Sequence, residues 1–234
     1  MRLLVANPNA TESVTDACAM LARAAASPGT EIVGWTNREG PALVDSWFTD
    51  YAAGATLAPA LRRLQPAPDA VVLAGFGNYG TAAVKEVLDV PVVALAEAAL
   101  SMAIPLCRRF AIVTTAHRMV AYTEDLVATL GFRERCAGVT AIQLPPLGAA
   151  MRDEAVVGEL AAEVERVRSL GRAEVVILGG SRLSPLAAPL RKLTPMTVLE
   201  PVACGVQMAE ALVRLGLAPG RIQPAAPSPR GEAR

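Results

Sequence analysis

Two stretches of the chain decide the fold: VVLAGFGNYGTAAVKEVLDVPVVALAEAA at residues 71–99 and VILGGSRLSPLAAPLRKLTPMTVLEPVAC at residues 176–204. Each runs from a short apolar segment through a turn containing glycine to a second apolar segment. The offset between them is constant, so that Gly75 falls on Gly180. An internal repeat of this kind predicts two similar halves that face each other, with a ligand site between them.

Short apolar runs rich in β-branched residues recur along the chain, and a run of four or five such residues is typical of a strand buried on both faces of a parallel sheet. Between these runs, apolar residues recur at helical spacing, as in Val156, Leu160, Val164 and Val167. The alternation predicts an α/β protein made of two pseudo-symmetric, doubly wound, flavodoxin-like halves with parallel sheets. The expected strands cover residues 3–6, 31–35, 70–74, 91–95, 110–114, 139–143, 174–178 and 196–199.

Composition excludes several classes of protein. The chain has 234 residues, of which 53% are hydrophobic and 19% charged, so a wholly disordered chain is excluded. The 22 basic residues balance the 22 acidic residues, which argues against electrostatic capture of nucleic acid or of an anionic membrane. A single histidine and four scattered cysteines argue against a metal site. The tail at residues 223–234 is rich in proline, alanine and arginine and is predicted to be disordered.

The longest apolar run, residues 91–107, contains Glu97 and Pro105 and is therefore not expected to cross a membrane. The first residues, MRLLVANPNA, are too short an apolar stretch for a signal peptide. The cysteines lack the spacing of a disulfide framework. We therefore expect a cytoplasmic protein with reduced thiols.

Four expected strands end in polar or glycine-rich turns. Parallel strands present their carboxyl ends at one edge of a sheet, and ligands of doubly wound folds bind there. The sequence therefore predicts a substrate site between the halves. The predicted substrate-binding residues at these strand ends are Asn7, Asn9, Gly75, Phe76, Gly77, Asn78, Thr114, Thr115, Gly179, Gly180 and Arg182.

Residues 75–80, GFGNYG, match the dinucleotide pattern G-x-G-x-x-G, and Glu97 follows 17 residues after Gly80. A nucleotide-dependent oxidoreductase is thus one interpretation. However, this pattern normally opens a βαβαβ half, and the bulky Tyr79 stands where a pyrophosphate needs close approach. Glycine-rich backbone at a helix N-terminus also binds carboxylates and oxyanions. Residues 179–181 form a matching loop in the second half. Because two facing anion-binding loops suit a small ligand better than a dinucleotide, we favour a small carboxylate, amide or imide as ligand and expect no cofactor.

Several motifs together carry a family resemblance from the first residue to about Leu217. The chain resembles the aspartate/glutamate/hydantoin racemase superfamily, most closely its hydantoin and allantoin racemase branch. The motifs are VANPNAT at 5–11, GPALVDSWF at 40–48, VVLAGFGNYG at 71–80, VPVVALAEAAL at 90–100, RFAIVTTAHRMV at 109–120 and AEVVILGG at 173–180.

This resemblance implies a cofactor-free site between two halves, formed by residues 1–98 with 203–222 and by residues 99–202. It implies a small-molecule carboxylate, amide or ureide as substrate, and a homo-oligomer. It also adds Phe48 to the substrate-binding residues, because GPALVDSWF matches a flap-like segment that closes over ligand.

Racemases of this superfamily place one cysteine in each glycine-rich loop; one thiolate removes the α-proton, and the other thiol returns a proton on the far face. The resemblance puts these positions at Gly75 and Gly180, and glycine cannot transfer a proton. We therefore expect an isomerase, decarboxylase or lyase variant that stabilises an enolate or oxyanion, rather than two-cysteine racemisation. A related arylmalonate decarboxylase-type branch lacks one of the two cysteines. The two glycines also predict extra volume for a bulkier substrate.

The predicted catalytic residues are Tyr79, Ser181 and His117. Tyr79 and Ser181 can donate to an enolate, and His117 is the side chain that ordinarily titrates near neutrality. Ser181 and His117 also have structural interpretations, since Ser181 can cap a helix and a lone histidine is more often structural or exposed. Two alternative functions remain open: a non-catalytic binding protein of the same fold, and a true hydantoin racemase that uses other acid and base groups.

The four cysteines of the chain lie elsewhere, and Cys136 precedes a strand without any site signal. Cys18 lies on the apolar stripe of a helix and is expected in the core. Cys107 adjoins Arg109, which could lower its pKa, but it precedes a strand and so lies at the wrong end of the sheet. Cys204 opens a helix, where the helix dipole favours a thiolate.

Overall fold

The computed structural model describes residues 1–144 and 154–220. Within these residues, eight strands form two parallel sheets of four strands, in the orders β2-β1-β3-β4 and β6-β5-β7-β8. The two orders are equivalent, which confirms the repeated α/β halves. Each predicted strand is present, with ends that differ by at most three residues. The strands are β1(Arg2–Asn7), β2(Glu31–Thr36), β3(Ala70–Leu73), β4(Val92–Ala94), β5(Phe110–Thr115), β6(Cys136–Ile142), β7(Val175–Gly179) and β8(Thr197–Leu199).

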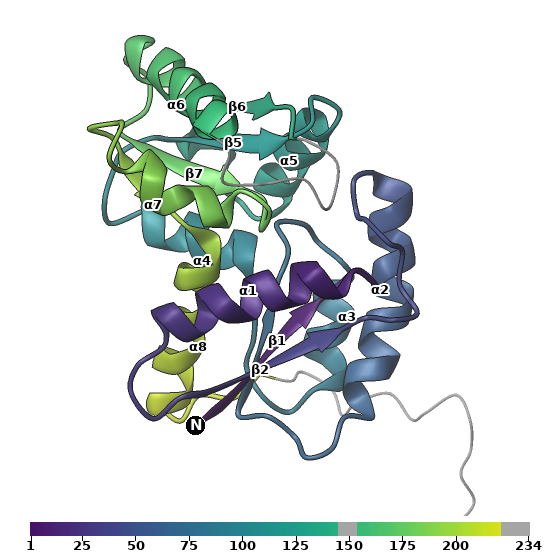
Figure 1. Ribbon diagram of the computed structural model, residues 1–234. Helices are drawn as coiled ribbons and strands as arrows, with labels where there is room; N and C mark the ends of the chain where they lie inside the picture. The colour runs from purple at the N-terminus through teal and green to yellow at the C-terminus, as the bar shows by residue number, and fades with distance from the viewer. Residues whose placement is uncertain (145–153, 221–234) are drawn as a thin grey trace, which may run out of the picture.

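Helices cover both faces of each sheet, as a doubly wound fold requires (Figure 1). The helices α1(Glu12–Ala25), α4(Leu95–Ala103), α5(Met119–Thr129) and α8(Pro201–Arg214) contribute to one continuous core between the two sheets. On the outer faces, α2(Trp47–Arg62) and α3(Thr81–Val87) cover the first sheet, and α6(Glu154–Ser169) and α7(Ala187–Leu190) cover the second. Two short 3₁₀ helices, η1(Arg133–Arg135) and η2(Ser184–Leu186), complete the described elements.

The C-terminal helix α8 returns to the first sheet and packs beside α1 and α4 (Figure 1). Its Glu210 is fully buried and accepts hydrogen bonds from the Ser27 amide at 2.8 Å, the Ser27 hydroxyl at 2.5 Å and the Thr30 hydroxyl at 2.6 Å. Arg214 adds an ion pair at 2.6 Å. Burial raises the pKa of Glu210, but the hydrogen bonds outweigh it and lower the pKa to about 2. Glu210 therefore fastens α8 to the loop between α1 and β2.

The exact boundaries of the two halves remain a prediction, and the tail at residues 223–234 lies outside the described residues. In residues 1–144 and 154–220, no helix has the length and apolar character needed to cross a membrane.

In both sheets the strand order reverses at the central pair, between β1 and β3 and between β5 and β7. Such reversals leave a crevice at the carboxyl ends of the strands, because the connections leave in opposite directions. The two crevices face each other, and the residues that follow these four strands form the candidate site.

Candidate functional site

A cavity of about 790 Å³ lies between the two halves, at the carboxyl ends of β1, β3, β5 and β7. This is the place that the repeat predicts. Ten of the predicted site residues line it: Asn9, Gly75, Phe76, Tyr79, Thr114, Thr115, Gly179, Gly180, Ser181 and Arg182.

Five predicted site residues are not in the cavity wall. His117 is exposed at the turn between β5 and α5. Phe48 is 80% exposed on α2. Asn7 is fully buried and shapes the turn after β1, because its side-chain amide donates to Asn9 Oδ1 at 3.0 Å. Gly77 and Asn78 belong to the first glycine loop but do not reach the cavity wall.

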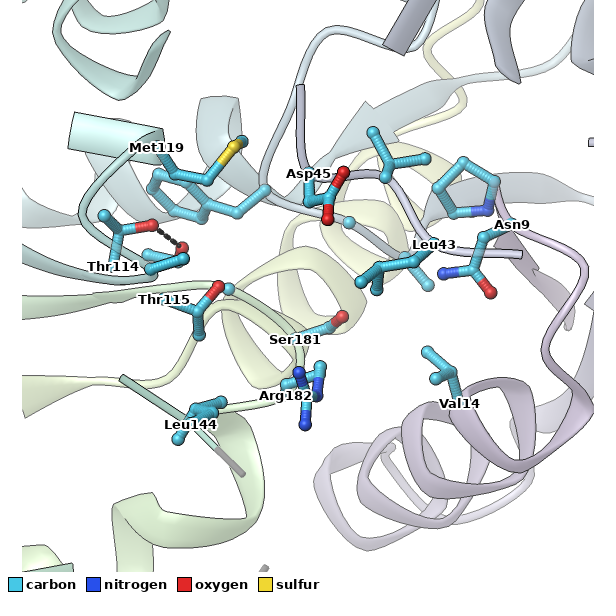
Figure 2. Close-up of a pocket in the computed structure, with 18 of the residues that line it drawn as sticks. Asn9, Val14, Leu43, Asp45, Thr114, Thr115, Met119, Leu144, Ser181 and Arg182 are labelled. Carbon is cyan, nitrogen blue, oxygen red and sulfur yellow. Dashed lines mark hydrogen bonds between the residues drawn. The ribbon is translucent and has the colours of Figure 1, made fainter. Parts of the chain in front are cut away.

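The wall also contains side chains that the sequence did not single out as site residues. Asp45 lies in the segment GPALVDSWF and forms an ion pair with Arg118, at the start of α5, and both residues line the cavity. Leu43 and Met119 add apolar surface beside them. Figure 2 shows Asn9, Asp45, Thr115 and Ser181 directed into one space from separate segments. The motif GPALVDSWF was the sequence signal that could have indicated Asp45. No sequence pattern indicated that Arg118, rather than its neighbour His117, would line the cavity.

Tyr79 covers the position where a side chain of residue 75 would stand. An ideal Cβ on Gly75 would lie 2.5 Å from both Cε2 and Oη of Tyr79, closer than real Cβ contacts allow. An ideal Cβ on Gly77 would meet the same ring, 2.5 Å from Cζ. The prediction that Gly75 leaves open volume is therefore wrong, because the tyrosine ring fills it. The phenol lies in the wall where the first thiol was expected.

Gly180 differs from its counterpart in the first half. An ideal Cβ there meets only Thr115, 3.5 Å from Cγ2 and 3.8 Å from Oγ1, which is ordinary contact. The prediction of extra volume therefore fits the second loop alone. The two repeats supply a phenol on one side of the cavity and open space on the other, so the site is chemically asymmetric.

In the first glycine loop, residues 75–80, three of the six backbone amides, those of Gly75, Asn78 and Tyr79, donate to acceptors within the protein. The Asn78 N–H donates to the Tyr122 hydroxyl at 2.9 Å, and the Tyr79 N–H donates to Asp50 Oδ1 at 2.9 Å. The loop therefore offers only part of its backbone to an anion. Among the described residues, the amide N–H of Phe76 has no acceptor, and its residue lines the cavity. That amide remains available to an oxyanion.

On the opposite wall, the amide N–H of Ser181 also has no acceptor in the described part of the chain. The Ser181 hydroxyl is hydrogen-bonded with the buried Cys18 thiol of α1. The Thr114 hydroxyl donates to the Gly179 carbonyl at 2.8 Å, as Figure 2 shows, so the last carbonyl group of β7 is hydrogen-bonded within the protein. Partial burial lowers the pKa of Arg182 from its ordinary value, but a guanidinium remains charged at neutral pH. This wall thus offers a cation and hydrogen-bond donors to an anionic or carbonyl group.

Burial raises the pKa of the Tyr79 phenol well above its usual value, and nearby Tyr122 and Asp50 add to the effect. Tyr79 is therefore protonated at neutral pH, and its hydroxyl can donate a hydrogen bond. In the described part of the chain, two non-glycine residues have positive φ, Tyr79 at 46° and Ala116 at 62°, and both line this cavity. Backbone strain of this kind concentrates at functional sites.

Comparisons with known proteins agree with this architecture. Residues 3–209 match the family model described as Asp/Glu/Hydantoin racemase. The chain belongs to this family. It is 35% identical over 222 residues to the hydantoin racemase of Paenarthrobacter aurescens, covering 92% of each chain. It also resembles the solved allantoin racemase of Pseudomonas fluorescens, with 36% identity, a TM-score of 0.89 and full coverage of both chains. Unliganded arylmalonate decarboxylase shares the fold, with 18% identity, a TM-score of 0.62 and coverage of 91% and 92%.

In this member of the racemase family, no cysteine occurs among the described residues that line the cavity. Burial raises the pKa of Cys18 to about 12 and that of Cys204 to about 12. Burial also raises the pKa of Cys107, so the prediction that neighbouring arginines could lower it is wrong. These cysteines are therefore protonated thiols away from the cavity wall, and none replaces the expected pair.

Proposed function

We propose that the protein is a cofactor-independent enzyme that forms an enolate- or oxyanion-type intermediate from a small carboxylate, amide or ureide. Tyr79 is the proton donor on one face of that intermediate. The observation that carries this proposal is the position of the Tyr79 hydroxyl, 2.5 Å from an ideal Cβ on Gly75. The Tyr79 phenol therefore occupies the space that a catalytic side chain at position 75 would occupy.

Two observations support this class of substrate. The relatives named above are hydantoin and allantoin racemases, so cyclic ureides are the first candidates. Arg182 and the Ser181 amide provide groups for a carboxylate or a carbonyl oxygen on the wall opposite Tyr79.

A decarboxylation illustrates the chemistry that needs only one proton donor. The bond between the α-carbon and a carboxyl group breaks, CO₂ leaves, and the electron pair remains as an enolate. The amides of Phe76 and Ser181 stabilise the oxyanion, and the Tyr79 hydroxyl gives its proton to the α-carbon. Water then returns a proton to the phenolate. Protonation from one side yields a single enantiomer.

A second candidate is a hydantoin racemase with a carboxylate and a phenol in place of two thiols. Asp45 favours it, because it is the acidic side chain among the described residues of the cavity wall. In this scheme the Asp45 carboxylate removes the α-proton, and Tyr79 returns one. The product distinguishes the candidates, since racemisation gives both enantiomers and decarboxylation gives CO₂ and one enantiomer.

The test is incubation in D₂O with 5-substituted hydantoins, allantoin, both aspartate enantiomers and 2-substituted malonates. NMR follows deuterium entry at the α-carbon and CO₂ loss, and chiral chromatography follows configuration. We expect turnover in the wild type and at least a ~100-fold loss in Tyr79→Phe. Tyr51→Phe is the matched control, because Tyr51 is 72% exposed and does not line the cavity.

Two results would contradict the proposal. Turnover by Tyr79→Phe at the wild-type rate would show that the phenol is not the proton donor. Ligand-dependent stabilisation without any turnover would favour the non-catalytic binding protein. The cytoplasmic location and the homo-oligomeric state also remain predictions.

A further inference from the structure

Asp50 is a buried carboxylate that joins three segments of the molecule. It lies on α2 with only 4% of its surface exposed. Its Oδ1 accepts the Tyr79 amide N–H at 2.9 Å and the Tyr122 hydroxyl at 2.8 Å. The Tyr122 oxygen in turn accepts the Asn78 amide N–H at 2.9 Å. Asp50 and Tyr122 therefore bind two consecutive amides of the first glycine loop.

The contact crosses from one half to the other, because Tyr122 belongs to α5 of the second half. The Trp47 ring packs edge-on against Tyr122, with ring centroids 5.6 Å apart and planes at 69°. The Asp45–Arg118 ion pair is a further tie between the same two segments. The shape of the first glycine loop is thus set partly by a helix of the opposite half.

Tyr79 needs this support because its backbone is left-handed, with φ of 46°. A residue with a side chain keeps that conformation only where its surroundings hold it. Helix α2 also backs the loop directly, since an ideal Cβ on Gly54 would lie 2.9 Å from the Gly80 nitrogen and the Tyr79 carbonyl carbon. Without the two hydrogen bonds to Asp50 and Tyr122, the loop can relax and the Tyr79 ring can leave Gly75.

We propose that Asp50 and Tyr122 are positioning residues that hold the Tyr79 hydroxyl in the cavity wall at Gly75. Neither residue lines the cavity, so both act through Tyr79. The chemical role of Tyr79 rests on the proposed function, whereas its placement by Asp50 and Tyr122 does not.

The test uses the full-length chain labelled with 3-fluorotyrosine. The sequence contains three tyrosines, so the ¹⁹F spectrum has three signals, assigned by single Tyr→Phe changes. A soluble gadolinium chelate broadens exposed signals, and Tyr51 is 72% exposed whereas Tyr79 is 6% exposed. Tyr122→Phe removes the hydroxyl that joins Asp50 to the loop and keeps the ring against Trp47. We expect the Tyr79 signal to broaden severalfold more in this variant than in the wild type.

Asp50→Ala is a second variant that removes the shared acceptor, and Tyr51→Phe is the control that removes an exposed phenol oxygen from the same helix. Shielding of Tyr79 that stays at the wild-type level in both Tyr122→Phe and Asp50→Ala overturns the positioning role. Loss of shielding in both variants, but not in the control, supports it. Melting temperatures of all samples show whether the chain is folded.

Turnover measured on the same samples separates this inference from the proposed function. We expect Tyr122→Phe to lower kcat at least ~10-fold with little change in KM, because it displaces a proton donor and leaves the ligand contacts in place. A wild type without turnover would refute the proposed function, and the shielding of Tyr79 would still decide the positioning role.

Discussion

Gly75→Ala is the change that tests the packing of Tyr79 most simply. The new methyl group would lie 2.5 Å from Cε2 and Oη of a ring that is 6% exposed, so the ring or the loop must shift. Overpacking of this kind costs about 1–3 kcal/mol. Gly180→Ala is the matched control, because its methyl group would meet Thr115 at 3.5 Å, which is ordinary contact.

Any Gly→Ala change also restricts the unfolded chain, which stabilises the protein by about 0.4–1 kcal/mol. That effect is common to the two variants, so their difference isolates the overpacking. For a chain of this size, about 1–3 kcal/mol corresponds to a difference of roughly 2–12 °C in melting temperature, with Gly75→Ala the less stable. Urea unfolding followed by circular dichroism measures the same difference as a free energy.

A double-mutant cycle identifies the ring as the cause. In a Tyr79→Ala background, Gly75→Ala should cost about 1–3 kcal/mol less than in the wild type, because the clashing atoms are gone. Equal stability of Gly75→Ala and Gly180→Ala, or an unchanged cost in the Tyr79→Ala background, would refute this account of the wall.

Three further predictions concern stability, binding and thiol reactivity. Glu210→Gln should remove about 3 kcal/mol at neutral pH, because a pKa near 2 lies ~2.5 units below the ordinary value of 4.5. Since the pKa of Glu210 is lower in the folded than in the unfolded chain, this stability is fully present above about pH 5 and is lost as pH falls towards 2. Urea unfolding across that range should show a free energy of unfolding that depends less on pH in Glu210→Gln than in the wild type. The control Glu165→Gln, at an exposed position, should show little change in stability. Arg182→Lys should raise KM about 10-fold for a carboxylate substrate, because an ammonium cannot form the bidentate pair; an unchanged KM would place the carboxylate elsewhere. Cys18 and Cys204 should react with a disulfide reagent only after unfolding, since both are buried with pKa values raised to about 12; rapid reaction of either in the native protein would contradict this burial.

Much of the fold was predictable because its signals are local. Buried parallel strands leave continuous apolar runs, and the repeat places Gly75 on Gly180, so the two crevices and about half of the residues in the cavity wall follow from the sequence. The site residues that belong directly to strand ends, such as Thr114 and Gly179, were found for the same reason.

The remaining details depend on contacts between distant segments, which no local pattern carries. The Tyr79 ring covers Gly75 because Asp50, 29 residues away, binds the Tyr79 amide in a left-handed conformation. His117 does not line the cavity, although its neighbours Ala116 and Arg118 do, and Ala116 has a φ of 62° at the end of β5.

The central claim is that a phenol, not a thiol, carries the proton in this cavity. The most direct measurement compares deuterium entry at the α-carbon of the best substrate for a variant with all four cysteines changed to alanine and for Tyr79→Phe, each against the wild type. We predict that the cysteine-free protein keeps most of the wild-type rate and that Tyr79→Phe loses at least ~100-fold. Loss of exchange in the cysteine-free protein, with exchange retained in Tyr79→Phe, would contradict the claim.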